Sequence, residues 1–356
     1  MRKKSACIKI PKQQGQKAII LGNKLGIINN ELQVQRDQNF LYIPLVSKPS
    51  QDELESFKEQ IEGCVFSTYT FTEQKKSEPS LTEMLDNKLP PHLLASLPHS
   101  VDFVGDIAII EIPPELDPYK NLVGQTVLQM NQNLRTVLAK AGAVSGTYRL
   151  REFNVIAGEP QTETIHKEYG CQYYVDVAKA YFSPRLSHEH NRVASLVKEG
   201  ETVVDLFAGV GPFAIPIAKN HKDVKIYAVD INQCAVEFLK RNIRLNRVQD
   251  SVHPILGDAK QVAKEQLSNI ADRVIMNLPE KAIDFVDAAC KTVKSTGGIV
   301  HFYFFVNASE SFEDVKLRFA EEVEKCGRKV ERFVFFRLVR ETAPYEWQAV
   351  LDAEIG

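Results

Sequence analysis

Strand and helix patterns alternate along residues 181–356, and this alternation limits the possible fold more than any other feature of the sequence. β-branched and aromatic runs are separated by helical patterns of about 10–15 residues, as in the βαβ units of a parallel sheet. Examples of these runs are VVDLF, KIYAVDI and RVIM. The last two runs, KVERFVFFRLV and EWQAVLDAEI, follow each other with no helix between them and must therefore pair antiparallel.

Seven such runs with an antiparallel pair at the end predict a seven-stranded, doubly wound α/β sheet of the Rossmann-like class I methyltransferase type. Two smaller α/β (α+β) domains precede it. The predicted domains are a basic N-terminal domain at 1–72, a linker rich in charge, Ser and Pro at 73–90, a middle domain at 91–180 and the sheet domain at 181–356. Within the middle domain we expect one strand at 101–112 and one helix across 121–142.

The first strand-to-helix turn of the sheet domain has the sequence Asp205-Leu-Phe-Ala-Gly209-Val-Gly211. Its glycines allow a ligand to approach the backbone closely, and the following helix supplies unpaired N–H groups. A dinucleotide-binding loop would carry a third glycine, but residue 214 is alanine. Asp205 would repel a pyrophosphate and would attract the amino group and sulfonium of S-adenosylmethionine.

Two further carboxylates end the next two strands. Asp230 lies nineteen residues after Gly211, where its side chain can accept hydrogen bonds from ribose hydroxyls, and Asp258 can meet the adenine edge. A structural glycine turn in another α/β protein would leave the three aspartates unexplained. We therefore expect S-adenosylmethionine as the cofactor.

The fourth strand ends at Asn277-Leu278-Pro279. Proline ends the strand pattern, so the amide of Asn277 should lie at the carboxyl edge of the sheet, where open α/β sheets bind ligands. Amine-directed methyltransferases carry Asn-Pro-Pro-Tyr here, and cytosine-C5 enzymes need a nearby nucleophilic cysteine. This chain lacks both, because Cys290 lies well inside the next predicted helix. The acceptor is therefore expected to be a different atom.

The distribution of charge and the cysteine content predict the kind of partner and the cellular compartment of the protein. Residues 1–50 contain nine Lys or Arg against Glu31 and Asp37, which suggests a module for an anionic partner, although a solvated basic surface would look the same. The six cysteines are scattered, which predicts a reducing compartment and no disulfide framework. No apolar run suits a signal peptide or a membrane span, so we expect a cytoplasmic protein. His188 and His190 have no third ligand near in sequence, so no metal is expected.

The motifs RVIMNLP, VVDLFAGVGPF, TIHKEYG, VDVAKAYFSPRL and TYRLREF together resemble those of the archaeal and eukaryotic tRNA (guanine-N1)-methyltransferases that modify position 37, next to the anticodon. The resemblance runs from about Leu93 to the end of the chain. The first block is similar to the small N-terminal domain of the archaeal members. The resemblance implies methylation of N1 of guanosine 37. It also implies that the catalytic part binds the anticodon stem-loop of tRNA and that the N-terminal domain binds the tRNA body. One chain carries every part, so a monomer is expected.

The resemblance also assigns roles to residues. It implies that Glu189 is the general base, that Arg149 contacts guanine O6, that Asn277 holds the base and that Tyr181 lines the pocket. Phe207 and Pro279 complete the expected cofactor set, which comprises Tyr181, Asp205, Phe207, Gly209, Gly211, Asp230, Asp258, Asn277 and Pro279. Where family members often have Gly-Gly-Glu-Arg, this chain has Ser-His-Glu-His and keeps the glutamate, within a Ser/His/Asn-rich segment that we expect to be a loop.

The chemistry of guanine agrees with these roles. N1 becomes nucleophilic when its proton is lost, so a glutamate to accept that proton and an arginine to stabilise charge on O6 form a minimal catalytic pair. Without the resemblance, Arg149 could instead bind phosphate and Glu189 could be a surface residue. A wyosine-pathway relative acting on a modified guanine, or a non-catalytic RNA-binding protein, are the alternatives. The intact D-x-F-A-G-V-G-P-F and N-L-P motifs favour the methyltransferase.

Overall fold

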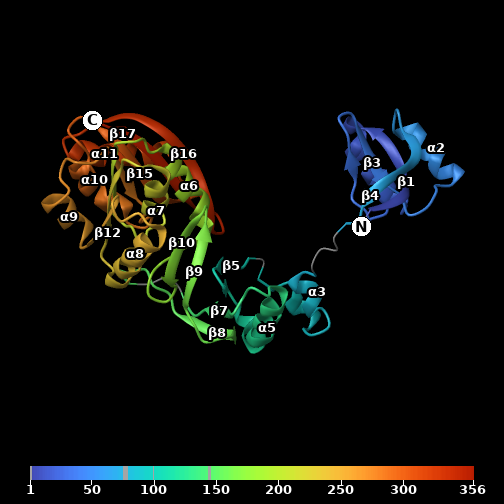
Figure 1. Ribbon diagram of the computed structural model, residues 1–356, viewed down its shortest axis with the longest axis horizontal. Coiled ribbons are helices and arrows are strands. Elements are labelled where there is room, and N and C mark those ends of the chain that lie inside the picture. The colour runs from blue at the N-terminus through green and yellow to red at the C-terminus, as the bar shows by residue number, and fades with distance from the viewer. Residues whose placement is uncertain (1, 75–78, 99, 143–145) are drawn as a thin grey trace. The chain divides into compact units, whose positions relative to one another are not determined.

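The chain folds into two compact units, Met1–Pro79 and Ser80–Gly356 (Figure 1). The computed structural model describes residues 2–74, 79–98, 100–142 and 146–356. Residues 75–78 of the predicted linker lie outside the described residues. The linker itself is shorter than predicted, because residues 81–89 already belong to the second unit and place Leu85 and Leu89 in a hydrophobic core.

The first unit is a four-stranded sheet in the order β2-β3-β1-β4, with two helices packed on one face. Alternate residues of β1, such as Ile8 and Ile10, meet Ala18 and Leu21 of α1 and Phe57 of α2 in its core. The elements are β1 Arg2–Pro11, η1 Lys12–Gln14, α1 Gly15–Lys24, β2 Gln35–Arg36, β3 Phe40–Pro44, α2 Gln51–Gln60 and β4 Val65–Thr72. The basic N-terminal domain predicted at 1–72 is thus a folded sheet with its own core.

The second unit begins with a smaller sheet in the order β5-β6-β7-β8. Its elements are α3 Leu81–Leu85, α4 Pro91–Leu94, β5 Asp102–Val104, β6 Ile107–Ile110, η2 Pro114–Tyr119, α5 Lys120–Met130, β7 Thr136–Lys140 and β8 Phe153–Gly158. The predicted strand at 101–112 is a hairpin that turns at Gly105, whose φ is 57°.

The helix predicted across 121–142 is also wrong in its second half. It ends at Met130, and residues 136–140 form β7, which pairs parallel with β6. Asn131 and Asn133 form a turn between the two elements, since the Asn133 N–H donates to Asn131 Oδ1 (3.0 Å). Four consecutive buried residues, Thr136 to Ala139, then suit a central strand better than one face of a helix.

A hairpin of β9 Glu163–Glu168 and β10 Cys171–Asp176 connects this sheet to the larger one. Asparagines of α8 act on β10 as a neighbouring strand would. Asn242 Oδ1 accepts from the Tyr174 N–H (2.7 Å), and its Nδ2 donates to the Tyr174 and Val210 carbonyls, both at 3.0 Å. Asn246 repeats this pattern with Gln172 one helical turn later. The hairpin is thereby fixed to α8, and the chain that follows it leads directly into the site.

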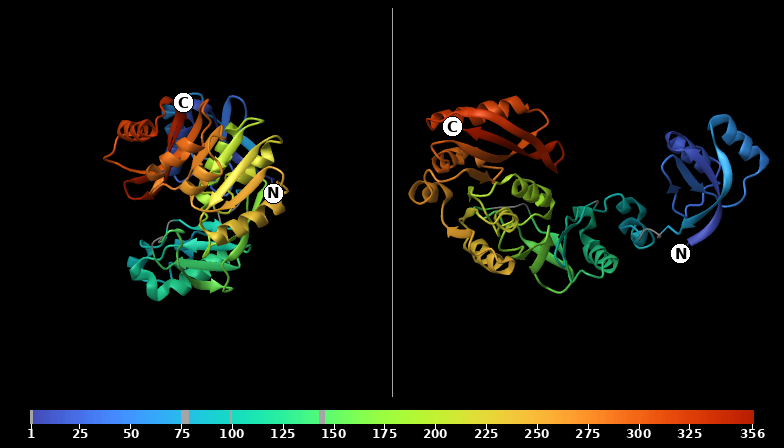
Figure 2. Two further views of the ribbon diagram at one scale, coloured as in Figure 1. Left: turned by 90° about the vertical axis from the view of Figure 1, so that its left-hand side faces the viewer. Right: turned by 45° about the horizontal axis from the view of Figure 1, so that its top comes forward.

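The large sheet has the order β13-β12-β11-β14-β15-β17-β16. Strands β11 to β15 are parallel and β16 pairs antiparallel with β17, both as predicted; β17 also pairs antiparallel with β15 and so lies between β15 and β16. Its elements are η3 Pro184–Leu186, α6 Ser187–Leu196, β11 Thr202–Asp205, α7 Ala214–Asn220, β12 Lys225–Asp230, α8 Gln233–Asn246, β13 Val252–Leu256, α9 Ala259–Glu265, β14 Arg273–Met276, η4 Ala282–Phe285, α10 Val286–Thr292, β15 Gly298–Asn307, α11 Phe312–Lys325, β16 Val330–Ala343 and β17 Glu346–Ile355. The long β16–β17 ribbon is red in Figure 2.

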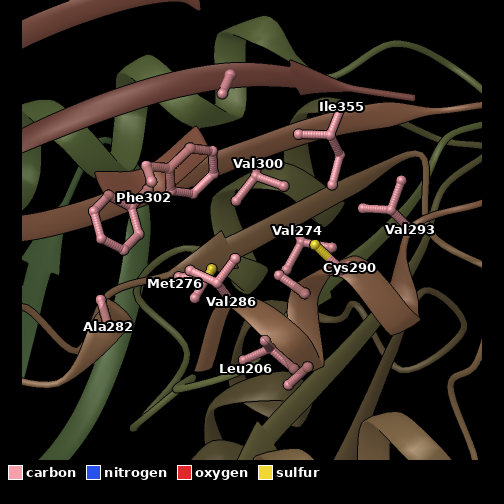
Figure 3. Packing of buried hydrophobic residues seen from close by; sticks show 14 of the residues in the cluster. Leu206, Val274, Met276, Ala282, Val286, Cys290, Val293, Val300, Phe302 and Ile355 are labelled. Carbon is pink, nitrogen blue, oxygen red and sulfur yellow. The ribbon is translucent and has the colours of Figure 1, made fainter. Parts of the chain in front are cut away.

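The two faces of this sheet differ in chemistry. On one face Val274, Met276, Val300 and Phe302 pack against Val286 and other residues of α10 (Figure 3). The opposite face carries the polar side chains that alternate with them along the strands, among them His301 and Tyr303, both fully buried. The segment predicted as a loop, 183–192, forms η3 and the start of α6, which packs on this second face through Val193 and Ala194.

All six cysteines are free. Among the described residues, no helix is both long and apolar enough to cross a membrane.

The link between α8 and the hairpin yields a test of the fold. We expect Asn242→Ala to lower the free energy of unfolding by about 2–4 kcal/mol, because it leaves one buried backbone N–H and two buried carbonyls without partners. Chemical denaturation measures this change. Lys240→Ala, on the exposed side of the same helix, is the control and should change stability by no more than about 0.5 kcal/mol. Equal stabilities of the two variants would show that the asparagine does not fix the hairpin.

Candidate active site

A cavity of about 580 Å³ opens at the carboxyl edge of the large sheet, where β11, β12, β13 and β14 end. It extends to the loop 146–149 of the smaller sheet. Its wall contains residues that follow each of the four strands: Phe207 and Gly209, Asp230 and Ile231, Gly257 and Asp258, and Asn277 and Leu278. This is the place at which open α/β sheets bind ligands.

The two glycines of this loop, Gly209 and Gly211, have different structural roles. Gly209 lines the cavity with a φ of 53°, and its N–H donates to Asp230 Oδ2 (2.7 Å). Gly211 has a φ of 96° and faces the protein interior, where a Cβ would lie 2.6 Å from Leu239 Cδ1 and 2.9 Å from Ile215 Cδ1. The structure therefore places Gly209 at the cavity, whereas Gly211 allows helices α7 and α8 to pack close to the loop.

Asp230 and Asp258 offer acceptor oxygens to the cavity. Asp230 is held by the Gly209 amide and by the Asn232 amide (2.8 Å), and burial raises the pKa of its carboxyl despite these hydrogen bonds. Asp258 caps α9, with Oδ1 accepting from the Lys260 and Gln261 amides at 3.0 and 3.1 Å. Both side chains are thus oriented before any ligand arrives.

Asp205 lies behind the cavity wall. It is fully buried, its Oδ1 accepts from the Phe207 N–H (3.2 Å), and its Oδ2 has no hydrogen-bond partner among the described residues. Burial raises the pKa of this carboxyl to about 7. The sequence predicted a contact with the cofactor, but Asp205 does not line the cavity; the next two residues, Leu206 and Phe207, do.

The rest of the wall suits an adenine ring and a cationic ligand. Phe207 meets Phe285 edge to face with ring centroids 5.0 Å apart, and Ile231 and Ala235 add apolar surface. The carboxylates of Asp230 and Asp258 in the same wall favour a ligand with hydroxyls, an amine and positive charge. The residues present therefore fit S-adenosylmethionine.

Arg149 and Tyr181 border three cavities. Besides the large one, they line a second cavity of about 390 Å³ and a small one of about 30 Å³. The small cavity is closed by Leu186, Asn277, Pro279, Phe305, Arg340 and Gln348. Pro279 is thus placed in the small cavity, and Asn277 faces both the large and the small one.

Arg149 itself is held in an unusual state. Its φ is 55°, a left-handed conformation that costs energy for a residue with a side chain. Its Nη2 donates to Glu280 Oε1 (3.2 Å), the guanidinium lies 5.4 Å from the Tyr181 ring centroid, and its Nε is buried without a partner among the described residues. Strain and an unpaired buried donor at the junction of the cavities suggest that this arginine awaits a ligand.

Glu189 is buried on the first turn of α6 and lines none of the three cavities. Its Oε2 accepts from Arg192 Nε (2.9 Å) and from the Tyr303 hydroxyl (3.0 Å). Arg337 Nη2 lies 3.0 Å from Oε1, but the geometry is not that of a hydrogen bond, so Oε1 has no hydrogen-bond partner among the described residues. The carboxylate lies one helical turn from Leu186, which does line the small cavity.

A buried polar chain continues from Arg192. Asp352 accepts from Arg192 Nη1 (2.6 Å) and lies 2.6 Å from His301 Nδ1. Arg273 Nη1 donates to His301 Nε2 (2.9 Å) and its Nε donates to Glu201 (2.9 Å). Since arginine can only donate, His301 must accept at Nε2 and donate from Nδ1 to Asp352. Burial lowers the pKa of His301, in agreement with a neutral ring.

Of the residues predicted from sequence, seven line the large cavity: Arg149, Tyr181, Phe207, Gly209, Asp230, Asp258 and Asn277. Sequence analysis missed Ile231, Glu280, Arg340 and Gln348. Ile231 could have been found as the residue after an acidic strand end. His188 and His190 lie in α6 rather than in an extended segment, and among the described residues no group of His, Cys, Asp and Glu is placed to hold a metal.

Comparison with known families gives three matches. The TRM5/TYW2 methyltransferase domain matches residues 164–331, the TYW2 N-terminal domain 81–162 and the tRNA methyltransferase 5 N-terminal domain 7–53. The chain is 36% identical to the tRNA (guanine(37)-N(1))-methyltransferase Trm5b of Pyrococcus abyssi over 98% of both chains.

The chain is also similar to solved structures, including the following two. The complex of aTrm5 and tRNALeu has a TM-score of 0.68 and 34% identity, over 98% of this chain and 99% of that one. TYW2 of Methanocaldococcus jannaschii in complex with AdoMet has a TM-score of 0.56 and 32% identity, over 72% of this chain and 99% of that one. Together with the cavity these matches identify S-adenosylmethionine as the cofactor.

The buried Asp205 predicts a pH dependence. A folded-state pKa of about 7 against an ordinary 3.8 means that the protonated carboxyl stabilises the fold fully below about pH 4 and that this stability is lost as the pH rises through about 7. Asp205→Asn removes the titration and keeps the acceptor for the Phe207 N–H. Without cofactor, its stability relative to the parent chain should therefore rise by about 3–4 kcal/mol between pH 4 and pH 8. Denaturation at both pH values measures the difference, and a constant difference would contradict the assignment.

Proposed function

Since this chain belongs to the tRNA (guanine(37)-N1)-methyltransferase family and uses S-adenosylmethionine, we propose that it transfers the methyl group to N1 of guanosine 37, next to the anticodon of tRNA. One observation carries the proposal. The cavity that carries the cofactor-type carboxylates also contains Arg149 and Asn277, so the methyl donor and a guanine can meet at one junction.

Each part of the cofactor has a partner in this cavity. The carboxylates of Asp230 and Asp258 would accept from the ribose hydroxyls and the adenine amine, and Phe207, Ile231 and Phe285 would enclose the adenine. The carboxylate of Asp205, when ionised, would act on the cationic cofactor from behind Leu206 and Phe207. The bound sulfonium supplies an activated methyl group, and the protein supplies its orientation.

Arg149 would stabilise the charge that gathers on guanine O6 when N1 loses its proton. The guanidinium already lies at the junction of the cavities. Among the described residues, Glu280 is its only hydrogen-bond partner, so this is the one hydrogen bond that a bound guanine would replace. Its left-handed backbone fixes its position in advance, so little reorganisation is needed when the base arrives.

Glu189 is the proposed general base. In this structure the carboxylate is held by Arg192 and Tyr303 and lies away from the cavities. It sits one turn from Leu186 at the small cavity, so a side-chain rotation that exchanges the Tyr303 hydroxyl for guanine N1–H would bring it into play. In that exchange Oε2 is the oxygen that accepts the N1 proton, and Oε1 stays 3.0 Å from Arg337 Nη2.

The first unit is proposed to bind the tRNA body. The face of its sheet opposite the helices carries Lys9, whose Nζ lies 4.1 Å from the Phe40 ring centroid, and Tyr42 stacked on Tyr69 at 4.2 Å. A lysine beside stacked aromatic rings on a sheet face suits phosphates and bases of RNA. A tethered module of this kind also raises the effective concentration of the catalytic unit at the tRNA.

A wyosine-pathway activity is the second candidate, because the TYW2 structure shares this catalytic fold. That structure covers only 72% of this chain, whereas the Pyrococcus abyssi methyltransferase covers 98%. The whole-length match and the separate match at residues 7–53 favour guanosine methylation. A non-catalytic RNA-binding role would leave the oriented carboxylates and the strained Arg149 without a purpose. We further propose that the enzyme acts in the cytoplasm as a monomer, since one chain holds all parts of the site.

Glu189→Gln tests the chemical assignment. Glutamine keeps the size of the side chain but cannot take the N1 proton, so single-turnover methylation should slow by roughly 10²–10⁴-fold while tRNA and cofactor still bind. Mass-spectrometric nucleoside analysis of the treated tRNA identifies the product as N1-methylguanosine at position 37. Glu324→Gln, an exposed glutamate on α11, should keep the full rate. An unchanged rate and pH dependence in the Glu189 variant would assign the base to another group.

Removing the first unit tests its role. A chain that starts at Ser80 keeps the complete catalytic unit. It should bind S-adenosylmethionine as before, but its affinity for tRNA should fall and depend less steeply on salt, by about one unit of the log–log slope for each phosphate that the first unit neutralises. Binding at several salt concentrations measures both slopes. Identical slopes would mean that the basic unit does not touch RNA.

A further inference from the structure

Arg340 and Gln348 form a hydrogen-bonded relay behind the small cavity. They are cross-strand partners in the β16–β17 ribbon. Arg340 donates from Nε to Gln348 Oε1 (2.9 Å), from Nη1 to Ser183 Oγ (3.1 Å) and from Nη2 to the Tyr181 hydroxyl (3.1 Å). Gln348, which is 1% exposed, then donates from Nε2 to Asn277 Oδ1 (3.1 Å).

The direction of this relay is fixed by chemistry. Arginine has no acceptor, so the oxygen of the Gln348 amide must face it and the nitrogen must face Asn277. The atom of Asn277 that meets Gln348 must therefore be its oxygen. Among the described residues, Asn277 Nδ2 has no hydrogen-bond partner, so a donor is what this amide presents to the cavities.

The same relay of hydrogen bonds also determines the direction in which the Tyr181 hydroxyl donates. Its oxygen accepts from Arg340 Nη2, which leaves its own hydrogen free to donate toward the cavities that Tyr181 lines. Arg149, the third polar group shared by the cavities, can only donate. Among the described residues, the small cavity is lined by no carboxylate. Glu280 lines both larger cavities and is engaged by Arg149, and the other carboxylates of those cavities are Asp230, Asp258, Asp102, Glu341 and Glu346.

We infer that Arg340 and Gln348 are positioning residues that orient Asn277 and Tyr181 so that these two residues, together with Arg149, present hydrogen-bond donors at the junction of the cavities, and that this group of donors selects a purine with a carbonyl at C6. The inference rests on the proposed function. Guanine carries acceptors at O6 and N7, whereas adenine places an amine donor at C6. Hypoxanthine has the same O6 and N7 as guanine and lacks only the 2-amino group, so inosine at the target position satisfies the same donors.

Gln348→Glu tests the direction of the relay. The carboxylate still accepts from Arg340 but cannot donate, so Asn277 must turn its Nδ2 toward residue 348 and present its oxygen to the cavities. Methylation is measured under single-turnover conditions on tRNA with guanosine, inosine or 6-thioguanosine at the target position, the last of which weakens the acceptor at position 6. The parent chain should use inosine within a few-fold of guanosine and should disfavour 6-thioguanosine by roughly 10-fold or more.

In the Gln348→Glu variant the rate on guanosine should fall by roughly 10- to 100-fold and the preference for guanosine over 6-thioguanosine should shrink toward unity. A variant that had merely lost structure would slow on all three substrates in proportion. Calorimetric measurement of S-adenosylmethionine binding checks that the large cavity is intact. Gln129→Glu, at an exposed position of α5, is the matched control. Gln348→Met, which neither donates nor accepts, decides the question if the glutamate variant does not fold.

The outcomes separate the two ideas. If the parent chain methylates none of the tRNAs, the proposed function fails. If it methylates guanosine at N1 and the Gln348 variants keep the parent's ratio of guanosine to 6-thioguanosine, the relay does not set the donors and the inference is overturned. Rejection of inosine by the parent chain, at more than about 100-fold, would likewise overturn it, because inosine offers the same O6 and N7 to these donors as guanosine does and the donors would then not set the selectivity.

Discussion

The insertion of β17 between β15 and β16 is the constraint on which the site depends. Its residues alternate, so Ala349, Leu351 and Ala353 join the core on one face of the sheet, while Gln348 and Asp352 face the other. Asp352 holds His301 and Arg192, and Gln348 holds Asn277. One antiparallel strand thus supplies the anchors for both the proposed base and the amide proposed to contact the substrate.

Polar atoms on this face fall into two groups. Those that form the chain from Glu201 to Asp352 have partners and act as scaffold, since a buried group without a partner is costly. Among the described residues, the buried side-chain atoms without a hydrogen-bond partner are Arg149 Nε, Glu168 Oε2, Tyr173 OH, Glu189 Oε1 and Asp205 Oδ2; of these, Glu168 Oε2 lies 3.6 Å from His166 Nε2 and Glu189 Oε1 lies 3.0 Å from Arg337 Nη2. Arg149, Glu189 and Asp205 are site candidates from sequence as well. Unsatisfied polarity therefore concentrates where ligands are expected, and the packing around these atoms offsets its cost.

The fold was predictable where periodicity was strong: the alternation predicts a parallel, seven-stranded doubly wound sheet, and the absence of a helix between the last two strands predicts their antiparallel pairing. The prediction failed where local propensity misled. The segment 121–142 has apolar spacing that fits a helix, yet Thr136 to Ala139 are a central strand because tertiary pairing with β6 outweighs propensity. The surroundings of Glu189 predict a loop because Ser, His and Asn are weak helix formers, yet they form a helix. Arg340 and Gln348 act through contacts across strands, which one sequence cannot reveal.

The position of β17 in the sheet also sets an order of assembly during synthesis. It follows every other strand in the chain but lies inside the sheet, so β16 has no place in the sheet until β17 has emerged from the ribosome. Until then the long apolar edge of β15, with Phe302 and Phe304, stays open to any strand that can pair with it. A nascent chain of this family is consequently both inactive and most prone to aggregate just before its final strand is made, and a chaperone would be needed most at that stage.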